Sequence, residues 1–178
     1  MRRFWTFKST TMKKKPCKVK IKLYICWIIH EVSEQIKPLV IMDLTIKLKK
    51  GLGDIAFGMP VEDVVKLLGT ADEVENIDNA ADESTTVLRY NDEGLTLFCE
   101  GENPTLACID IANEDCTLFG EYVFDMDERE VVALMVKNKI TEQDVDEEDW
   151  GERRVTFNEG NIDFYFDNGE LVSIILGA

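Results

Sequence analysis

Side chains that could perform nucleophilic or acid–base chemistry are few in this chain. Its single histidine is His30, so residues 42–178 contain no Ser/His/Asp or Cys/His arrangement in which a base could activate a nucleophile. The run Gly51-Leu52-Gly53 lacks the third glycine and the following helix of a phosphate-binding loop, and is typical of a turn. We therefore expect no enzyme, no catalytic residue and no cofactor.

Carboxylates are the abundant polar group, and hard cations such as Ca²⁺ prefer oxygen ligands. Two segments, 71–83 and 138–150, hold six acidic residues each. The residues that could surround a cation are Asp144, Asp146, Glu147, Glu148 and Asp149. Neither segment has the glycine and the final glutamate of an EF-hand, so a solvated acidic loop is favoured over a calcium site. We expect no metal site.

The five cysteines form no Cys-x-x-Cys pair and no Cys/His cluster, so neither a disulfide framework nor a metal site is indicated. Cys99 and Cys108 fall on neighbouring predicted strands and could approach each other. A role as small buried apolar side chains is the favoured interpretation. This predicts reduced thiols in a cytoplasmic protein.

Charge divides the chain at about residue 42. Residues 1–41 hold ten basic and two acidic residues and carry +8, so the total of −15 leaves −23 for the remaining 137 residues. Such a charge repels nucleic-acid phosphates and anionic lipid headgroups and attracts basic proteins. We expect a basic protein partner, either a toxin or a nucleic-acid-binding protein, and no direct nucleic-acid binding. An acidic surface that only promotes solubility is the simpler alternative.

Residues 1–41 also contain an apolar run, Leu23 to Ile29, which is far too short to span a membrane. Glu31 and Glu34 follow without a small-residue cleavage site, unlike a signal peptide. We expect a basic N-terminal extension that is disordered or a mis-called start, with Met42 as the natural first residue. The alternatives are a genuine basic tail and an unusual export signal, which would make the protein periplasmic.

Residues 42–178 show an internal repeat at a spacing of 67 residues. Residues 57–68 align with 124–135 and match a phenylalanine, a methionine, two valines and a leucine. Each copy begins with a helix signal. Pro60 suits a first helical position, while Asp127 and Glu130 form a capping-box pattern. The repeat predicts one unit over about 54–116 and a second over about 121–178.

Strand periodicity extends the repeat. Alternation assigns one face to the core, with the residues Leu95, Leu97, Cys99, Ile162, Phe164 and Phe166. The opposite face carries Thr96, Phe98, Glu100, Asp163, Tyr165 and Asp167. A further strand follows in each unit, at 106–111 and 171–176. The predicted fold class is α+β: two tandem repeats, each a helix, an acidic loop and a three-stranded antiparallel meander, form one larger antiparallel sheet with both helices on one face.

The first unit contains the residues Phe57-Gly58-Met59, then Val64, Leu67-Leu68-Gly69 and Asp72. This pattern resembles the Gly-Met-x-x-x-x-Val-x-x-x-x-Gly-x-Pro helix motif of the β-lactamase inhibitor proteins and of the SmpA/OmlA-type outer-membrane assembly lipoproteins. The resemblance implies tandem helix-and-sheet units that bind another protein across a concave sheet. This chain departs from the pattern by having Asp125 in place of the second glycine, Ala71 in place of the proline, and no paired cysteines. These departures concern the target more than the architecture.

The candidate binding residues form two groups. Phe98, Glu100, Asp163 and Tyr165 lie on the predicted open face, where aromatic side chains ringed by polar groups suit protein binding. Glu147, Glu148, Asp149 and Trp150 end the second acidic loop, where Trp150 is an anchor for a basic partner or a core residue. The sequence thus predicts an acidic protein-binding module, such as an immunity or inhibitor protein that covers a basic partner. The alternatives are an envelope-associated assembly module and a cation-binding protein.

Overall fold

The computed structural model describes residues 42–78, 84–147 and 151–178 of the chain. All of them belong to the unit of residues 41–178, into which the chain divides after Val40. These residues form an α+β fold that is mainly β, with two α-helices and two sheets in the described ranges.

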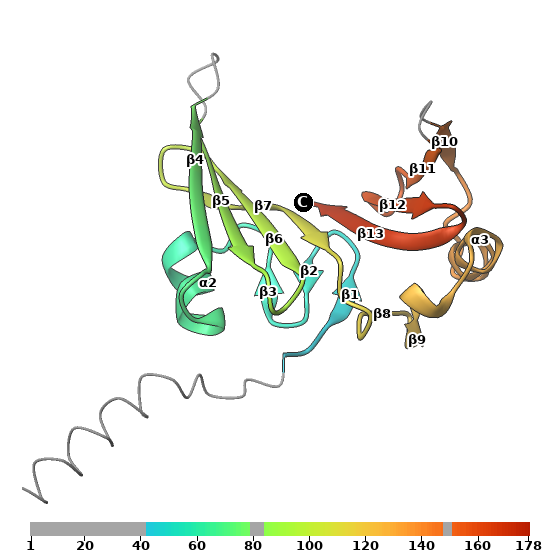
Figure 1. Ribbon diagram of the computed structural model, residues 1–178, viewed down its shortest axis with the longest axis horizontal. Coiled ribbons are helices and arrows are strands. Elements are labelled where there is room, and N and C mark those ends of the chain that lie inside the picture. The colour runs from blue at the N-terminus through green and yellow to red at the C-terminus, as the bar shows by residue number, and fades with distance from the viewer. Residues whose placement is uncertain (1–41, 79–83, 148–150) are drawn as a thin grey trace, which may run out of the picture. The chain divides into compact units, whose positions relative to one another are not determined.

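The larger sheet has eight antiparallel strands within the described residues, in the order β10-β11-β12-β13-β7-β6-β5-β4. Its strands are β4 (Glu73–Asp78), β5 (Ser84–Tyr90), β6 (Leu95–Glu100), β7 (Thr105–Ile111), β10 (Asp144–Glu147), β11 (Glu152–Phe157), β12 (Ile162–Asp167) and β13 (Glu170–Gly177). The last strand, β13, pairs with β7 at the middle of the sheet, as Figure 1 shows. Segments about 65 residues apart in the sequence therefore meet there.

The edge strands correct one prediction. Residues 71–83 and 138–150 were expected to be acidic loops, yet they contain β4 and β10. An edge strand that is exposed on both faces needs no apolar alternation, so the composition of these two segments did not indicate a strand. All four residues of β10 are exposed. Much of the acidic sequence thus lines the two edges of the sheet, where charged side chains discourage pairing with another chain.

A second sheet, which sequence analysis did not predict, has five short strands in the described residues, in the order β3-β2-β1-β8-β9. They are β1 (Thr45–Lys47), β2 (Gly51–Leu52), β3 (Ile55–Ala56), β8 (Thr117–Leu118) and β9 (Glu121–Tyr122). The alternating stretch 44–48 does contain a strand, β1, which pairs in parallel with β8. Gly51 and Leu52, expected in a turn, form β2 instead.

The second helix begins where its capping box predicts, whereas the first begins one residue later than expected, because Pro60 is its N-cap and not its first helical residue. α2 spans Val61–Leu68, with Pro60 at the N-cap. α3 spans Glu128–Lys137, and its capping box is complete: the Asp127 carboxylate accepts from the Glu130 N–H, and the Glu130 carboxylate accepts from the Asp127 N–H. Residues 123–125 form a short 3₁₀ helix before it. No helix within the described ranges is long and apolar enough to cross a membrane.

The core confirms the predicted strand alternation. The residues assigned to the core face of β6 and β12 are all buried, while those assigned to the opposite face are half-buried or exposed. Val64 of α2 and Val131, Leu134 and Met135 of α3 belong to the same buried cluster. Within it, the rings of Phe157 and Phe164 meet edge to face, with centroids 6.0 Å apart.

Two hairpins carry a β-bulge. In β6 and β7, Ala107 is the extra residue, because the register shifts between Phe98 and Cys99. In β12 and β13, Val172 is the extra residue, and the shift falls 67 positions further along the chain. A bulge bends its strand and redirects the side chain of the extra residue. Both bulges therefore alter the course of the strands at the middle of the sheet.

Candidate protein-binding face

The eight-stranded sheet has one face whose alternate side chains are buried in the core. Its other face is called the open face below. The strand register assigns its members as Glu73, Glu75, Ile77, Thr85, Val87, Arg89, Thr96, Phe98, Glu100, Thr105, Cys108, Asp110, Asp144, Asp146, Glu152, Arg154, Thr156, Asp163, Tyr165, Asp167, Glu170, Ser173, Ile175 and Gly177. Four of the eight predicted site residues, Phe98, Glu100, Asp163 and Tyr165, are among them.

The two aromatic side chains of the open face, Phe98 and Tyr165, are half-buried. Phe98 on β6 is opposite Cys108 on β7, and Tyr165 on β12 is opposite Ser173 on β13. Three strand spacings and an offset of four residues along the strands therefore separate them, roughly 19 Å at the usual strand geometry. Each ring keeps an exposed part that another protein could cover.

Tyr165 is held in place by a neighbouring arginine. Arg154 on β11 lies directly opposite Tyr165 and forms hydrogen bonds with the Asp146 carboxylate and with Tyr165. These bonds hold the pKa of the Arg154 guanidinium above its ordinary value. A side chain that is already held loses less conformational entropy when it binds a partner, so Tyr165 is a preorganised contact.

Carboxylates occupy the middle of the open face between the two rings. The Thr156 hydroxyl donates to Asp163 Oδ1 at 2.5 Å, and the Ser173 hydroxyl donates to Asp110. Asp163 and Asp110 both face Ile175 of β13, one from each side. The two carboxylates are thus held by hydroxyl groups on neighbouring strands and flank an apolar side chain.

Carboxylates from both halves of the chain lie around Cys108. Burial, followed by the charges of Asp110, Glu100 and Asp163, raises the pKa of the Cys108 thiol to about 11. These three residues come from β7, β6 and β12, so the sheet brings together two predicted site residues, Glu100 and Asp163, and adds Asp110. At neutral pH the thiol is protonated and therefore a poor nucleophile.

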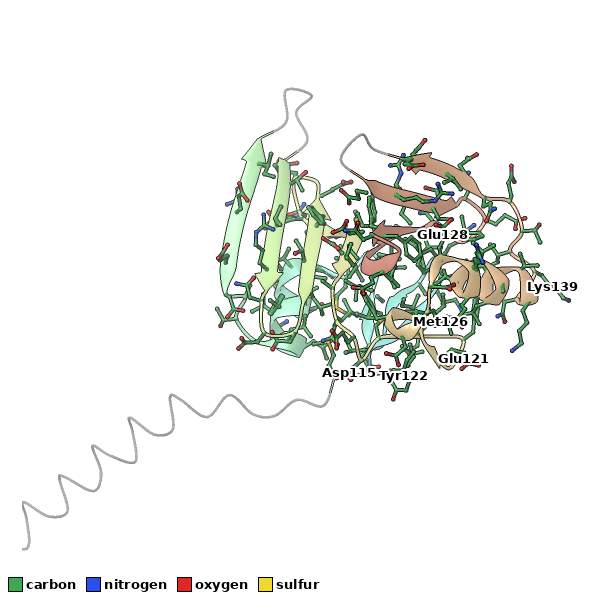
Figure 2. The ribbon with its side chains drawn as sticks, turned by 45° about the vertical axis from the view of Figure 1, so that its right-hand side comes forward. Asp115, Glu121, Tyr122, Met126, Glu128 and Lys139 are labelled. Carbon is green, nitrogen blue, oxygen red and sulfur yellow. The ribbon has the colours of Figure 1, made fainter. Side chains whose placement is uncertain are left out.

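The second group of predicted residues does not join the open face. Glu147 on β10 lies on the opposite side of the sheet, where its carboxylate is 3.2 Å from Arg153 Nη1. Arg153 also pairs with Glu128 of α3 at 2.9 Å, so this ion pair links strand to helix. Figure 2 labels Glu128 beside α3. Glu148, Asp149 and Trp150 lie outside the described residues.

Sequence reasoning missed Asp110, Arg154 and Ile175. Asp110 interrupts the apolar stretch 106–111, and this was the available signal that one face of β7 meets solvent. Arg154 could not be placed, because its position opposite Tyr165 depends on the strand register. Register follows from pairing, which a single strand does not encode.

The open face is rich in carboxylates, which can attract cations. Ten of its residues are acidic, and its two arginines are engaged: Arg89 with Glu73 and Glu75, and Arg154 with Asp146. The described residues contain no group of three or more Asp, Glu, His or Cys side chains that could hold a metal ion. The chemistry that remains is charge pairing and aromatic contact over a broad surface.

Comparisons with known proteins give little. No family model and no curated protein matches the chain. Among solved structures it is similar to an extracellular protein containing a SCP domain from Bacillus anthracis str. Ames, solved at 1.5 Å resolution. The two are 16% identical with a TM-score of 0.43, over 73% of this chain and 49% of the other, so the match spans about half of that protein. A likeness of this degree carries no argument about fold or function.

Proposed function

We propose that the open face binds a basic protein. One observation carries the proposal: Asp110 and Asp163 lie between the half-buried rings of Phe98 and Tyr165, and Glu100 lies beyond Phe98 on the same face. Within the described residues, none of the three carboxylates has a cationic partner closer than 4 Å. Lysine or arginine side chains of a partner would supply the missing charge, and the rings would supply apolar contact area.

Long-range electrostatics favours the same partner. Residues 42–178 carry −23, which accelerates encounter with a basic protein and makes binding sensitive to salt. Three carboxylates near one another also repel each other, so a cationic partner would relieve that repulsion. The charge and the aromatic contacts thus act in the same direction.

An inhibitor or immunity protein is the biological role that fits such a surface. It would neutralise a basic toxin, such as a nuclease, by covering the surface that the toxin uses for its own substrate. We place this action in the cytoplasm, with the periplasm as the alternative. N-terminal sequencing of the native protein tests the location, because a cleaved N-terminus within residues 1–41 would contradict a cytoplasmic site.

The internal duplication also belongs to the proposal, with residues 54–116 and 121–178 as copies of one unit whose helices cover one face of the shared sheet. The matched bulges support it. So do two isolated bridges that join the start of each helix to the first residue of β7 or β13: Pro60 with Thr105, and Asp127 with Glu170. An experimental structure whose two halves did not superpose with these bulges aligned would contradict the duplication.

The first test is an affinity capture from the source organism with the full chain as bait. Three baits are compared in parallel: the wild type, Asp163→Asn with Glu100→Gln, and the control Asp54→Asn, an exposed carboxylate outside the open face. The proposal expects a basic protein that a salt step releases, that the control retains and that the open-face variant loses. Equal capture by all three baits would place the binding surface elsewhere.

A further inference from the structure

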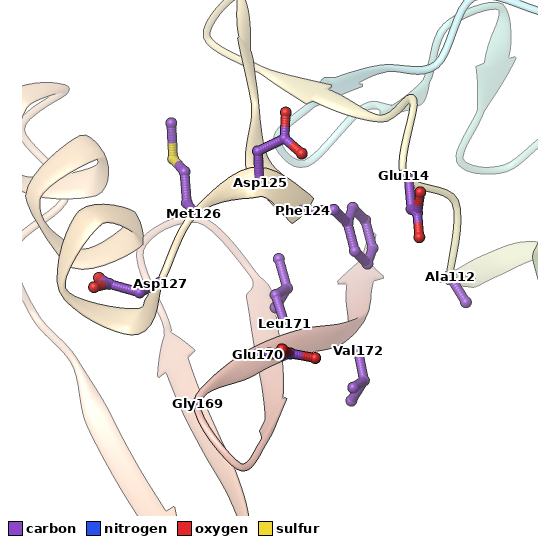
Figure 3. A pocket seen from close by; sticks show the side chains of 10 residues that line it. All are labelled: Ala112, Glu114, Phe124, Asp125, Met126, Asp127, Gly169, Glu170, Leu171 and Val172. Carbon is purple, nitrogen blue, oxygen red and sulfur yellow. The ribbon is translucent and has the colours of Figure 1, made fainter.

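A pocket of about 590 Å³ lies where three segments meet: residues 112–114, residues 124–127 and the β12–β13 turn with the start of β13 (Figure 3). This volume falls within the range of pockets that bind small ligands, about 300–1,000 Å³. Its apolar lining residues are Phe124, Met126, Leu171 and Val172. Its carboxylates are Glu114, Asp125, Asp127 and Glu170, and no basic residue lines it.

The walls are built by the core and by the bulge. Leu171 is 6% exposed and belongs to the buried cluster, against which Phe124 and Met126 also pack. Val172 is the extra residue of the β12–β13 bulge and is 43% exposed. The bulge therefore directs the Val172 side chain to the pocket, whereas a regular strand would place this side chain elsewhere.

Of the four carboxylates, that of Asp127 has a structural task. Asp127 caps α3, and Glu170 is bridged to Asp127 through the backbone. Glu114 and Asp125 are exposed and have neither a hydrogen-bond nor an ion-pair partner among the described residues. Figure 3 shows them on different segments around the ring of Phe124. A ligand with a planar cation could lie against this ring and pair with both carboxylates.

We infer that this pocket receives an arginine side chain of the basic partner. The inference rests on the proposed function, because it identifies one feature of that partner. The apolar walls accommodate the aliphatic stem, and the guanidinium meets Glu114, Asp125 and the face of Phe124. Arginine is chosen over lysine because a planar guanidinium stacks on an aromatic ring and bonds two carboxylates at once, whereas an ammonium is a strongly hydrated point charge.

The test uses N-acetyl-arginine-N-methylamide as the probe and the full chain labelled with ¹⁵N and ¹³C. We expect saturable NMR shift changes at Met126, Leu171 and Val172. The lysine analogue should bind more weakly, and the uncharged citrulline analogue, which is nearly isosteric with arginine, should cause no localised change. Equal responses to arginine and citrulline, equal or tighter binding of lysine, or no saturable change at these residues would overturn the inference.

Substitutions of Asp125 and Glu114 test whether these two carboxylates bind the probe. Asp125→Asn and Glu114→Gln should each weaken probe binding by about twofold to fivefold, the usual effect of one exposed charge pair. Glu121→Gln removes the same charge from β9 outside the pocket and should leave binding unchanged. Equal binding by all three variants would contradict the assignment. The probe presents no protein surface, so its failure would leave the open-face proposal standing, whereas failure of partner capture would leave the probe result intact.

Discussion

Glu100 of β6 and Asp163 of β12 lie on opposite sides of Cys108, and the charges of both raise the pKa of its thiol. The two carboxylates are 63 positions apart in the sequence. Both lie near Cys108 because β13 pairs with β7 and so joins the strands of the two halves in one sheet. Carboxylates from both halves of the chain therefore lie around Cys108 on the open face.

The reactivity of the Cys108 thiol depends on these charges. Because its pKa is about 11, Cys108 should react with iodoacetamide at neutral pH roughly a hundredfold more slowly than a free thiol. Asp163→Asn removes one negative charge, which lowers the pKa, increases the thiolate fraction and should accelerate alkylation at pH 9 by roughly twofold to tenfold. Peptide mass spectrometry measures the rate at Cys108 separately from the other cysteines. Equal rates in Asp163→Asn, the wild type and Asp54→Asn would contradict this arrangement.

The capping box of α3 should contribute measurably to stability. Asp127→Ala removes the acceptor for the Glu130 N–H and should lower the free energy of unfolding by about 0.5–2 kcal/mol. Asp127→Ser keeps an acceptor at the N-cap and should recover most of the loss. Urea unfolding followed by circular dichroism measures both variants. If serine destabilised the protein as much as alanine, the hydrogen bond would not be the cause.

The aromatic pair in the second half should be a major source of core stability. Phe164 is fully buried and meets Phe157 edge to face, so Phe164→Ala should cost about 3–5 kcal/mol of unfolding free energy. Phe164→Leu refills most of the volume and should cost clearly less. Chemical denaturation of the wild type and both variants gives the comparison. A negligible loss in the alanine variant would show that this core position is misplaced.

Local sequence patterns predicted the elements that depend on residues close together in the sequence. The capping pattern of Asp127 and Glu130 marks the start of α3, and alternation in 95–100 and 162–167 separates the buried face from the open one. The edge strands β4 and β10 escaped prediction because polar side chains on both faces remove the apolar period.

The candidate site was predictable in part. Phe98 and Tyr165 could be assigned to the open face from alternation alone, but the approach of Asp110 and Arg154 depends on strand pairing. The pocket beside α3 depends on the bulge at Val172, which arises from the register of two strands rather than from either sequence. Local patterns thus placed side chains on faces, and pairing decided which of them meet.

The most direct test of the central claim is a calorimetric titration of the captured basic partner against the full chain at low and high salt. The open-face account predicts that affinity falls as salt rises and that Asp163→Asn weakens binding by about tenfold at low salt, with a smaller salt dependence. Asp54→Asn, which removes an equal charge elsewhere, should bind like the wild type. An affinity that did not change with salt would contradict the account. So would an equal change of affinity in Asp163→Asn and Asp54→Asn.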